Sequence, residues 1–330
     1  MSQLADILVV DDLHTHYSTP QGTARVLNGV SLRIRPGEVL GLVGESGAGK
    51  SVLARSILNL IDPPGRVVKG RVLFDGQDLL TCREPVLRAL RGNAIGLIVP
   101  NPHLHLNPVV TIGEQIANVI RAHRDVSRHE AMAEAVRYLE KVGLPDPATQ
   151  ARSLPHELSG GMAQRVIIVM SLVNSPKLLL ADEPSGGLDV TVQLQILELM
   201  RELVTGRQTS MLLISRDLGI VAHYCDRVAV LYAGQIIEEA PVDVFFAEAR
   251  HPYSLELLRL GSPKHMNLQR LGRGDPALNP IHRPTGCPFH PRCLLAIDRC
   301  KVDMPETDVL GDHHSVRCHL ARRSSFGASS

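Results

Sequence analysis

The chain alternates between short apolar runs and longer stretches with helical periodicity. The runs "VLGLVG" and "LLLA" contain no charged residue, which is typical of strands buried on both faces. Strand patterns occupy residues 4–10, 30–43, 66–80, 177–182 and 210–215, the third with a turn at Asp75-Gly76. Helical patterns occupy residues 50–60, 112–172 and 191–205. Strands that alternate with helices predict an α/β fold around a parallel sheet.

The pattern changes beyond about residue 250, where Pro and Gly become frequent and cysteines gather. This change predicts a first domain over 1–250 and an extension over 251–330, which ends in a disordered tail, "ARRSSFGASS". Of the 6 cysteines, Cys82 and Cys225 stand alone. In a reducing compartment, the others favour a metal site over disulfides: Cys287, Cys293, Cys300 and Cys318.

Composition narrows the class of protein. The 330 residues carry a formal net charge of +1 and no long Lys/Arg run, which argues against a protein held to nucleic acid by a broad basic surface. No apolar run reaches the roughly 18 residues that suggest a membrane span. The start "MSQLADILVVDD" lacks the basic residues of a signal peptide, so a cytoplasmic protein is expected.

The segment "GESGAGKS" has the spacing of a phosphate-binding P-loop, and it lies between an apolar strand and a helical pattern. Its glycines let backbone N–H groups close around phosphate. Lys50 is expected to reach the β- and γ-phosphate oxygens, and the Ser51 hydroxyl to ligate Mg²⁺. The predicted nucleotide contacts are Gly44, Glu45, Ser46, Gly47, Ala48, Gly49, Lys50 and Ser51.

Two further segments carry groups that suit a nucleotide. After the strand at 177–182, Asp182 is expected to hold Mg²⁺, through water or directly, and Glu183 to polarise the attacking water. The segment "LSGGMAQR" places Ser159, Gly160 and Gly161 at the start of a helix, which suits an anion. Together with the P-loop and "SGGLD", these segments resemble the ATP-binding subunits of ABC transporters over about residues 5–250.

The resemblance implies a P-loop NTPase fold. Its parts would be a RecA-like parallel core, an antiparallel β subdomain and a helical subdomain at about residues 91–172. It also implies a head-to-tail dimer, in which each ATP lies between the P-loop of one subunit and the signature of the other, here Ser159 to Gly161. By the same resemblance Tyr17 stacks on adenine; an ordinary strand tyrosine is the alternative.

Further segments resemble the branch of the family that imports oligopeptides, dipeptides and nickel: "LNPVVTIGEQI", "HPYSLELL" and "RPTGCPFHPRC", with Met162 in the signature. Some members of that branch carry a [4Fe–4S] cluster on such cysteines. The spacing C-x5-C-x6-C-x17-C is looser than in ordinary zinc motifs. An iron–sulfur cluster, zinc, and reduced or partly disulfide-bonded cysteines stay open as alternatives. Surface positions are predicted for His290, His313, His314 and His319.

Two positions depart from the family pattern. Pro100 stands where the family has a glutamine that contacts Mg²⁺ and the attacking water, and the short, offset side chain of Asn101 does not replace it. Arg216 stands where the family has a histidine at the γ-phosphate. Arginine binds phosphate but does not exchange a proton near neutral pH. Two interpretations stay open: Arg216 holds ATP without helping to cleave it, or it turns to solvent.

The altered positions and the intact signature predict a site that binds ATP but hydrolyses it poorly, in a chain that completes its partner's site. By resemblance, the partners are a second, competent ATPase subunit in a heterodimer, two transmembrane permease subunits and, indirectly, an extracytoplasmic solute-binding protein. The expected location is the cytoplasmic face of the cell membrane. A soluble ABC ATPase that acts on DNA or ribosomes and a non-hydrolysing scaffold subunit are the alternatives.

Overall fold

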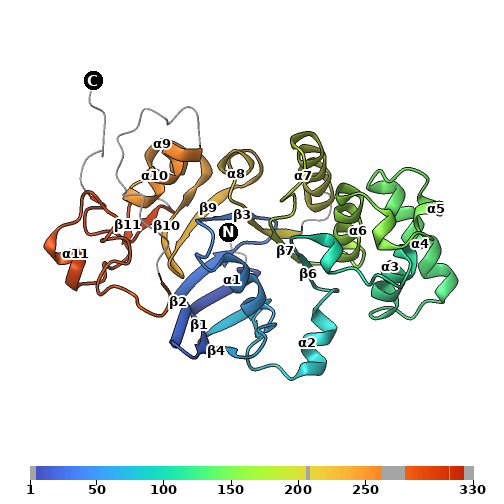
Figure 1. Cartoon of the computed structure of the whole chain (residues 1–330), viewed down its shortest axis with the longest axis horizontal. Helices are drawn as coiled ribbons and strands as arrows, with labels where there is room; N and C mark the ends of the chain where they lie inside the picture. Colours follow the sequence, from blue (N-terminus) through green and yellow to red (C-terminus); the bar gives the residue numbers. More distant parts are fainter. Residues whose placement is uncertain (1–4, 206–208, 262–278, 312, 323–330) are drawn as a thin grey trace.

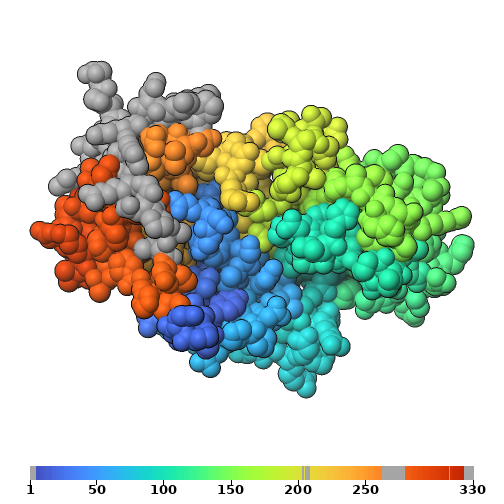
Figure 2. Space-filling model, in the orientation of Figure 1, coloured from blue at the N-terminus to red at the C-terminus, as the bar shows by residue number. Residues whose placement is uncertain are grey.

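The computed structural model describes residues 5–205, 209–261, 279–311 and 313–322. Two sheets form the middle of an elongated molecule (Figure 1). The helices within residues 112–172 lie at one end of the long axis, and the C-terminal extension lies at the other end (Figure 2). The predicted disordered tail lies almost entirely outside the described residues.

The antiparallel sheet consists of β1 (Leu8–Thr19), β2 (Gly22–Ile34), β4 (Gly65–Phe74) and β5 (Gln77–Asp78), in the order β2-β1-β4-β5. The turn at Asp75-Gly76 is confirmed, with both residues at positive φ. The strand predicted at 4–10 was too short, because polar residues and register shifts conceal the rest of β1. The pattern at 30–43 covers the end of β2 and all of β3 (Val39–Val43), which belong to different sheets.

The larger sheet has the strand order β11-β12-β10-β9-β3-β8-β7-β6. Its parallel strands are β3, β6 (Ile95–Ile98), β7 (Leu178–Asp182), β8 (Ser210–Ile214) and β9 (Arg227–Tyr232). It is extended at one edge by antiparallel strands, β10 (Gln235–Pro241), β11 (Asp308–Val309) and β12 (Ser315–Val316). The predicted α/β fold, with a parallel core and an antiparallel β subdomain, is confirmed.

The parallel strands are apolar because both faces of their sheet are covered. On β7, Leu178 and Leu180 pack in the core that the larger sheet shares with the antiparallel sheet and α1 (Lys50–Ile57). Leu179 and Ala181 lie on the other face, in a second core that includes the helices. A strand buried on both faces has no position that favours a polar side chain, which explains the uninterrupted apolar run.

Helices occupy much of 112–172, as the sequence predicts: α3 (Ile112–Arg121), α4 (Arg128–Lys141), α5 (Pro147–Gln150) and α6 (Gly160–Leu172). A capping box of Ser127 and Glu130 begins α4. The remaining helices of the described residues are α2 (Glu84–Leu90), α7 (Val190–Thr205), α8 (Leu218–Tyr224), α9 (Val242–Glu248), α10 (Pro252–Gly261) and α11 (Asp298–Val302). Within the described ranges, none of the helices has the length and apolar character needed to cross a bilayer.

The C-terminal extension is joined to the core, because its strand β12 pairs with β10. The Glu238 carboxylate on β10 is buried and accepts hydrogen bonds from the backbone N–H groups of Arg250, at 2.6 Å, and His251, at 2.9 Å. His314 Nε2 donates a third, at 2.9 Å. The prediction of a surface position for His314 was wrong: the residue is 4% exposed, because a buried carboxylate requires donors around it.

A buried arginine connects the two sheets. Arg227, at the start of β9, lies 3.1 Å from Glu38 and 3.4 Å from Glu239, and it donates a hydrogen bond of 2.6 Å to the Arg33 carbonyl on β2. Burial raises the pKa of Glu239, and the charge of Arg227 opposes that rise. Arg227 therefore gives a counter-charge to two acids, of which Glu38 is buried and Glu239 is half-buried.

The Arg227→Met variant is expected to unfold more easily, by about 3–5 kcal/mol, because carboxylates are left without a counter-charge. The loss should be smaller near pH 5 than near pH 8. Protonation of Glu239, whose pKa is already raised, then removes one of the unpaired charges. Urea unfolding at both pH values measures the change. Lys69→Met breaks an exposed pair with Asp12 and is the control, with an expected cost below about 1 kcal/mol. Equal losses for the two variants would contradict the role of Arg227.

Candidate functional site

The loop between β3 and α1 has the backbone conformation that its sequence motif predicts. Gly44 follows β3 and approaches β9 so closely that a Cβ atom there would lie 2.2 Å from the Leu231 carbonyl oxygen. Gly49, at φ 109°, directly precedes α1, in a conformation that favours glycine. A strand, a glycine-rich loop and a helix N-terminus in this order direct backbone N–H groups toward a bound phosphate.

Lys50 begins α1 and folds back over the loop. Its Nζ donates hydrogen bonds to the carbonyl oxygens of Gly44, at 2.6 Å, and Glu45, at 3.0 Å. Burial lowers the pKa of Lys50, while the charges of the nearby carboxylates oppose that shift. A phosphate would give this ammonium group a charged acceptor in place of two carbonyls, so the loop is suited to bind a phosphorylated ligand.

Asp182 ends β7 and is 3% exposed, yet its Oδ1 has no hydrogen-bond partner. Burial raises the pKa of this carboxyl, against a hydrogen bond with Ser51 and the charge of Lys50. Mg²⁺ prefers oxygen ligands, and a buried carboxylate oxygen without a partner requires one. Ser51 and Asp182 therefore fit Mg²⁺, which either residue would hold directly or through water.

Three predicted site residues follow three neighbouring strands. Pro100 comes after β6, Glu183 after β7 and Arg216 after β8. These strands are parallel neighbours in the order β8-β7-β6. Their carboxyl ends therefore lie at one edge of the sheet, which is where ligands bind in folds of this kind. The structure thus brings the two altered positions to the same edge as the expected catalytic acid.

The side chains of Arg216 and Glu183 form an ion pair. Arg216 Nε donates a hydrogen bond of 2.8 Å to Glu183 Oε1, and both residues line one hollow. Arg216 is 62% exposed and Glu183 is 19% exposed. Burial, and then the charge of Arg216, lower the pKa of Lys50, so the guanidinium lies within electrostatic reach of the loop. Neither sequence interpretation included this contact, in which the arginine holds the acid expected to polarise water.

The signature residues begin α6. The Ser159 hydroxyl accepts a hydrogen bond of 3.3 Å from the Met162 N–H and caps the helix. Ser159 and Gly160 are exposed, and a Cβ atom at Gly160 would meet Leu188 only at 3.6 Å. Over the described residues, the segment makes no hydrogen bond to the P-loop of its own chain. This exposed helix start is therefore accessible to an anion from outside the chain.

Comparison with known proteins agrees with this geometry. Residues 27–186 match the family described as ABC transporter, and residues 237–300 match the one described as oligopeptide/dipeptide transporter, C-terminal region. A putative peptide import ATP-binding protein of Brucella abortus is 41% identical, over 94% of this chain and 96% of its own length. The dipeptide transport ATP-binding protein of Escherichia coli is 40% identical, over 95% and 96%. The chain belongs to the ATP-binding subunits of ABC transporters.

A solved structure supports the ABC ATPase fold. The dimeric structure of MJ0796, described as a bacterial ABC transporter cassette, has a TM-score of 0.65 and 26% identity, and the match covers 71% of this chain and 98% of that one. The P-loop NTPase fold implied by the sequence resemblance is therefore confirmed in three dimensions.

Tyr17 lies near the end of β1 in this ABC ATPase. Its half-buried ring covers Gly65, where a Cβ atom would lie 2.4 Å from Tyr17 Cε1. The ring therefore has a packing partner in its own chain. Adenine stacking by Tyr17 stays a prediction.

The four clustered cysteines are free, and their side chains line one pocket of the extension. Burial raises the pKa of Cys287 to about 11 and that of Cys318 to about 12, and it also raises the pKa of Cys293. In the ranges that the structure describes, no three Cys, His, Asp or Glu side chains are arranged to hold a metal ion. The four thiols therefore lie close together without the geometry of metal ligands. The described residues contain no preformed site for the predicted [4Fe–4S] cluster.

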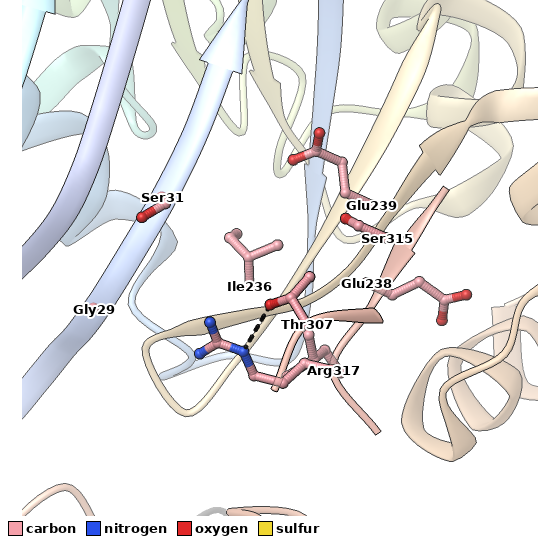
Figure 3. A pocket seen from close by; sticks show the side chains of 9 residues that line it. Gly29, Ser31, Ile236, Glu238, Glu239, Thr307, Ser315 and Arg317 are labelled. Atoms are coloured by element: carbon pink, nitrogen blue, oxygen red, sulfur yellow. Dashed lines mark hydrogen bonds between the residues drawn. The ribbon is translucent and has the colours of Figure 1, made fainter. Parts of the chain in front are cut away.

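A separate pocket lies where β2, β10 and the segment around β12 meet (Figure 3). Arg317 Nε donates a hydrogen bond of 3.3 Å to the Thr307 hydroxyl at this pocket. Its remaining lining comes from Gly29, Ser31, Ile236, Ile237, Glu238, Glu239 and Ser315. None of these residues belongs to the nucleotide site, so the pocket marks the junction between core and extension.

Two residues of the extension contact the P-loop and were not predicted from the sequence. Arg292 forms an ion pair with Glu45, and the Tyr253 hydroxyl accepts a hydrogen bond from the Glu45 N–H. Both lie in segments that carry the family resemblance, "HPYSLELL" and "RPTGCPFHPRC". Arg292 is 247 positions from Glu45, and no spacing rule indicates such a contact.

The Lys50→Ala variant should bind Mg-ATP at least about tenfold more weakly, because the cation that faces the phosphates is lost. Equilibrium binding of labelled ATP measures the effect. Lys141→Ala, at the exposed end of α4, is the control and should keep the parent affinity. If Lys50→Ala also keeps the parent affinity, this loop is not the nucleotide site.

Proposed function

We propose that this chain is one of two different ATPase subunits of a peptide-importing ABC transporter, and that its own site binds ATP but hydrolyses it slowly. The names of its relatives, a peptide import and a dipeptide transport ATP-binding protein, support the substrate class. The ion pair between Arg216 and Glu183 is the observation that carries the slow site. The exposed signature supports a role in completing the site of the partner subunit.

Hydrolysis requires a carboxylate that accepts a hydrogen bond from the attacking water. Glu183 Oε1 already accepts one from Arg216, at 2.8 Å. For Oε1 to accept a hydrogen bond from water instead, Glu183 must give up its charge-assisted hydrogen bond with the Arg216 guanidinium. Lys50, Ser51 and Asp182 take no part in this pair, so ATP binding is retained while attack is slowed.

Pro100 removes a second polar group from the same edge. Its ring offers neither a donor nor an acceptor. Asn101 is exposed, at φ 57°, before a short 3₁₀ turn (Pro102–Leu104), so it does not supply the missing amide. Mg²⁺, if bound by Ser51 and Asp182, would neutralise phosphate charge. Because Pro100 replaces the glutamine of the family pattern, the metal ion and the attacking water would each have one polar neighbour fewer.

The signature favours pairing with a different subunit. Two copies of this chain would combine two sites with the same Pro100 and Arg216, and no fast site would remain. In a heterodimer, the intact Ser159–Gly161 segment faces a competent P-loop and ATP is hydrolysed there. The related cassette MJ0796 has been described as a dimer, which supports association of two such subunits.

We place the chain at the cytoplasmic face of the membrane, with two transmembrane permease subunits and an extracytoplasmic solute-binding protein that delivers peptide. The family and the names of the relatives support this placement. Leu104 and Val109, shortly before α3, are 79% and 81% exposed. Single exposed apolar residues are common on protein surfaces, so we base the permease contact on the family resemblance, in which the helical subdomain that includes both residues contacts the membrane subunits.

A [4Fe–4S] cluster stays part of the proposal for the extension. The convergence of four thiols on one pocket supports it, although they must lose their protons to become ligands.

Protein prepared without oxygen should be brown and contain about four iron atoms per chain. Cys287→Ser should remove the colour, whereas Cys82→Ser, outside the cluster, should keep it. Iron analysis and visible absorption measure both. Colourless protein with one zinc per chain would favour the zinc alternative, and metal-free protein would leave the cysteines as reduced thiols.

Glu183→Gln should change the ATPase rate of the assembled transporter by less than about twofold, because this acid serves the slow site. Gly160→Asp should lower the rate more than about tenfold, because the added carboxylate would face the γ-phosphate bound by the partner and repel it. Phosphate release by the purified complex measures both.

Gly160→Asn is the matched control, since asparagine has nearly the volume of aspartate and carries no charge. It separates electrostatic repulsion from a steric effect. Equal, large losses from Glu183→Gln and Gly160→Asp would show that both sites turn over, and the asymmetric assignment would be abandoned.

A further inference from the structure

The second residue of the P-loop is held by the C-terminal extension from two directions. Arg292 Nη1 and Nη2 donate to the two carboxylate oxygens of Glu45, each at 2.8 Å. The Glu45 N–H donates to the Tyr253 hydroxyl, also at 2.8 Å. The Glu45 carbonyl accepts hydrogen bonds from Lys50 and Ala48. Every polar group of Glu45 is therefore engaged, and the extension engages two of the three.

Arg292 is itself fixed in place. Its side chain is 11% exposed, and its guanidinium carbon lies 5.9 Å from the ring centroid of Tyr232 and 5.7 Å from that of Phe289. The backbone N–H of Arg292 donates a hydrogen bond of 3.0 Å to the Phe289 carbonyl. Rings on both the core strand β9 and the extension thus support the guanidinium. A two-pronged contact of this kind differs from a mobile surface pair.

Tyr253 is held by the same aromatic cluster. It is 1% exposed, and its ring centroid lies 4.5 Å from that of Tyr232 and 5.5 Å from that of Phe289. The packed ring therefore holds the Tyr253 hydroxyl in position to accept the hydrogen bond from the Glu45 N–H.

Glu45 places a negative charge in a loop that binds a polyanion. A carboxylate without a counter-charge next to a triphosphate opposes binding by like-charge repulsion. Arg292 cancels that charge, and Tyr253 fixes the backbone of the same residue. Without these two contacts, the Glu45 carboxylate would have no counter-charge beside the phosphates, and its N–H would have no protein acceptor.

We propose that Arg292 and Tyr253 are positioning residues of the ATP site, through which the C-terminal extension sets the affinity of the P-loop for Mg-ATP. They contact Glu45 and act on the nucleotide through it. The proposal concerns binding, so it holds whether this site hydrolyses ATP quickly or slowly. It requires only that the P-loop is the nucleotide site.

The test is a double-mutant cycle on the full chain, with the Kd for Mg-ATP as the readout. Arg292→Met keeps the length of the side chain and removes its charge, so it should weaken binding about tenfold. In the Glu45→Gln background, the same change should alter the Kd by less than about twofold, because no unpaired carboxylate remains. The Kd of Arg292→Lys should lie between those of the parent and Arg292→Met, because lysine keeps the charge but cannot form two parallel hydrogen bonds to the carboxylate.

Arg299→Met is the matched control, since Arg299 pairs with Asp303 at the surface of the same extension. It should keep the parent Kd. Tyr253→Phe keeps the ring and removes the acceptor for the Glu45 N–H, so it should weaken binding about threefold or more.

An unchanged Kd for Arg292→Met would overturn the proposal. So would an equal loss in both backgrounds, because Arg292 would then act only by packing the extension. If Arg292→Met fails to fold, the same comparison with Arg292→Lys in both backgrounds decides the outcome. Lys50→Ala, measured in parallel, separates this failure from a wrong assignment of the P-loop, because only the latter leaves that variant with the parent affinity.

Discussion

The nucleotide site depends on one constraint: parallel strands that are buried on both faces deliver their carboxyl ends to a single edge. β3 leads into the P-loop, β7 into Asp182 and Glu183, and β8 into Arg216. A residue that directly follows such a strand has little freedom to leave its neighbours. Pro100 and Arg216, which lie two residues beyond the ends of β6 and β8, reach the same edge, and there they are the basis of the slow site that we propose.

Arginines control the charge of this ATPase at two further places. Arg227 lies between Glu38 and Glu239 in the core, where an unpaired carboxylate would destabilise the fold. Arg292 pairs with Glu45 in the P-loop, where an unpaired carboxylate would oppose the substrate. The extension supplies the second arginine, and its strand β12 also continues the main sheet through β10. A region that looks like an appendage in the sequence is thus joined to both the core and the site.

The features that sequence reasoning predicted correctly are those whose requirements are local. The P-loop needs glycines between a strand and a helix, and the signature needs a cap and glycines at a helix start. The two ion pairs on which the proposals rest are not local. Arg216 and Glu183 are 33 positions apart, and Arg292 and Glu45 are 247 positions apart. The second half of β1 was missed because bulges interrupt its alternation. The cysteines gave candidate ligands, but their geometry depends on how the extension folds.

The central claim is that Pro100 and the pair of Arg216 with Glu183 make this chain's site slow. Single-turnover hydrolysis at this site tests it most directly, in a transporter whose partner subunit carries a disabled catalytic acid. Pro100→Gln combined with Arg216→His should accelerate the step by about 10²–10⁴-fold, and by more than the two single changes together, because the restored groups act as a unit. A double variant that binds ATP and stays as slow as the parent would contradict the claim, as would a parent site that already matches the partner's rate.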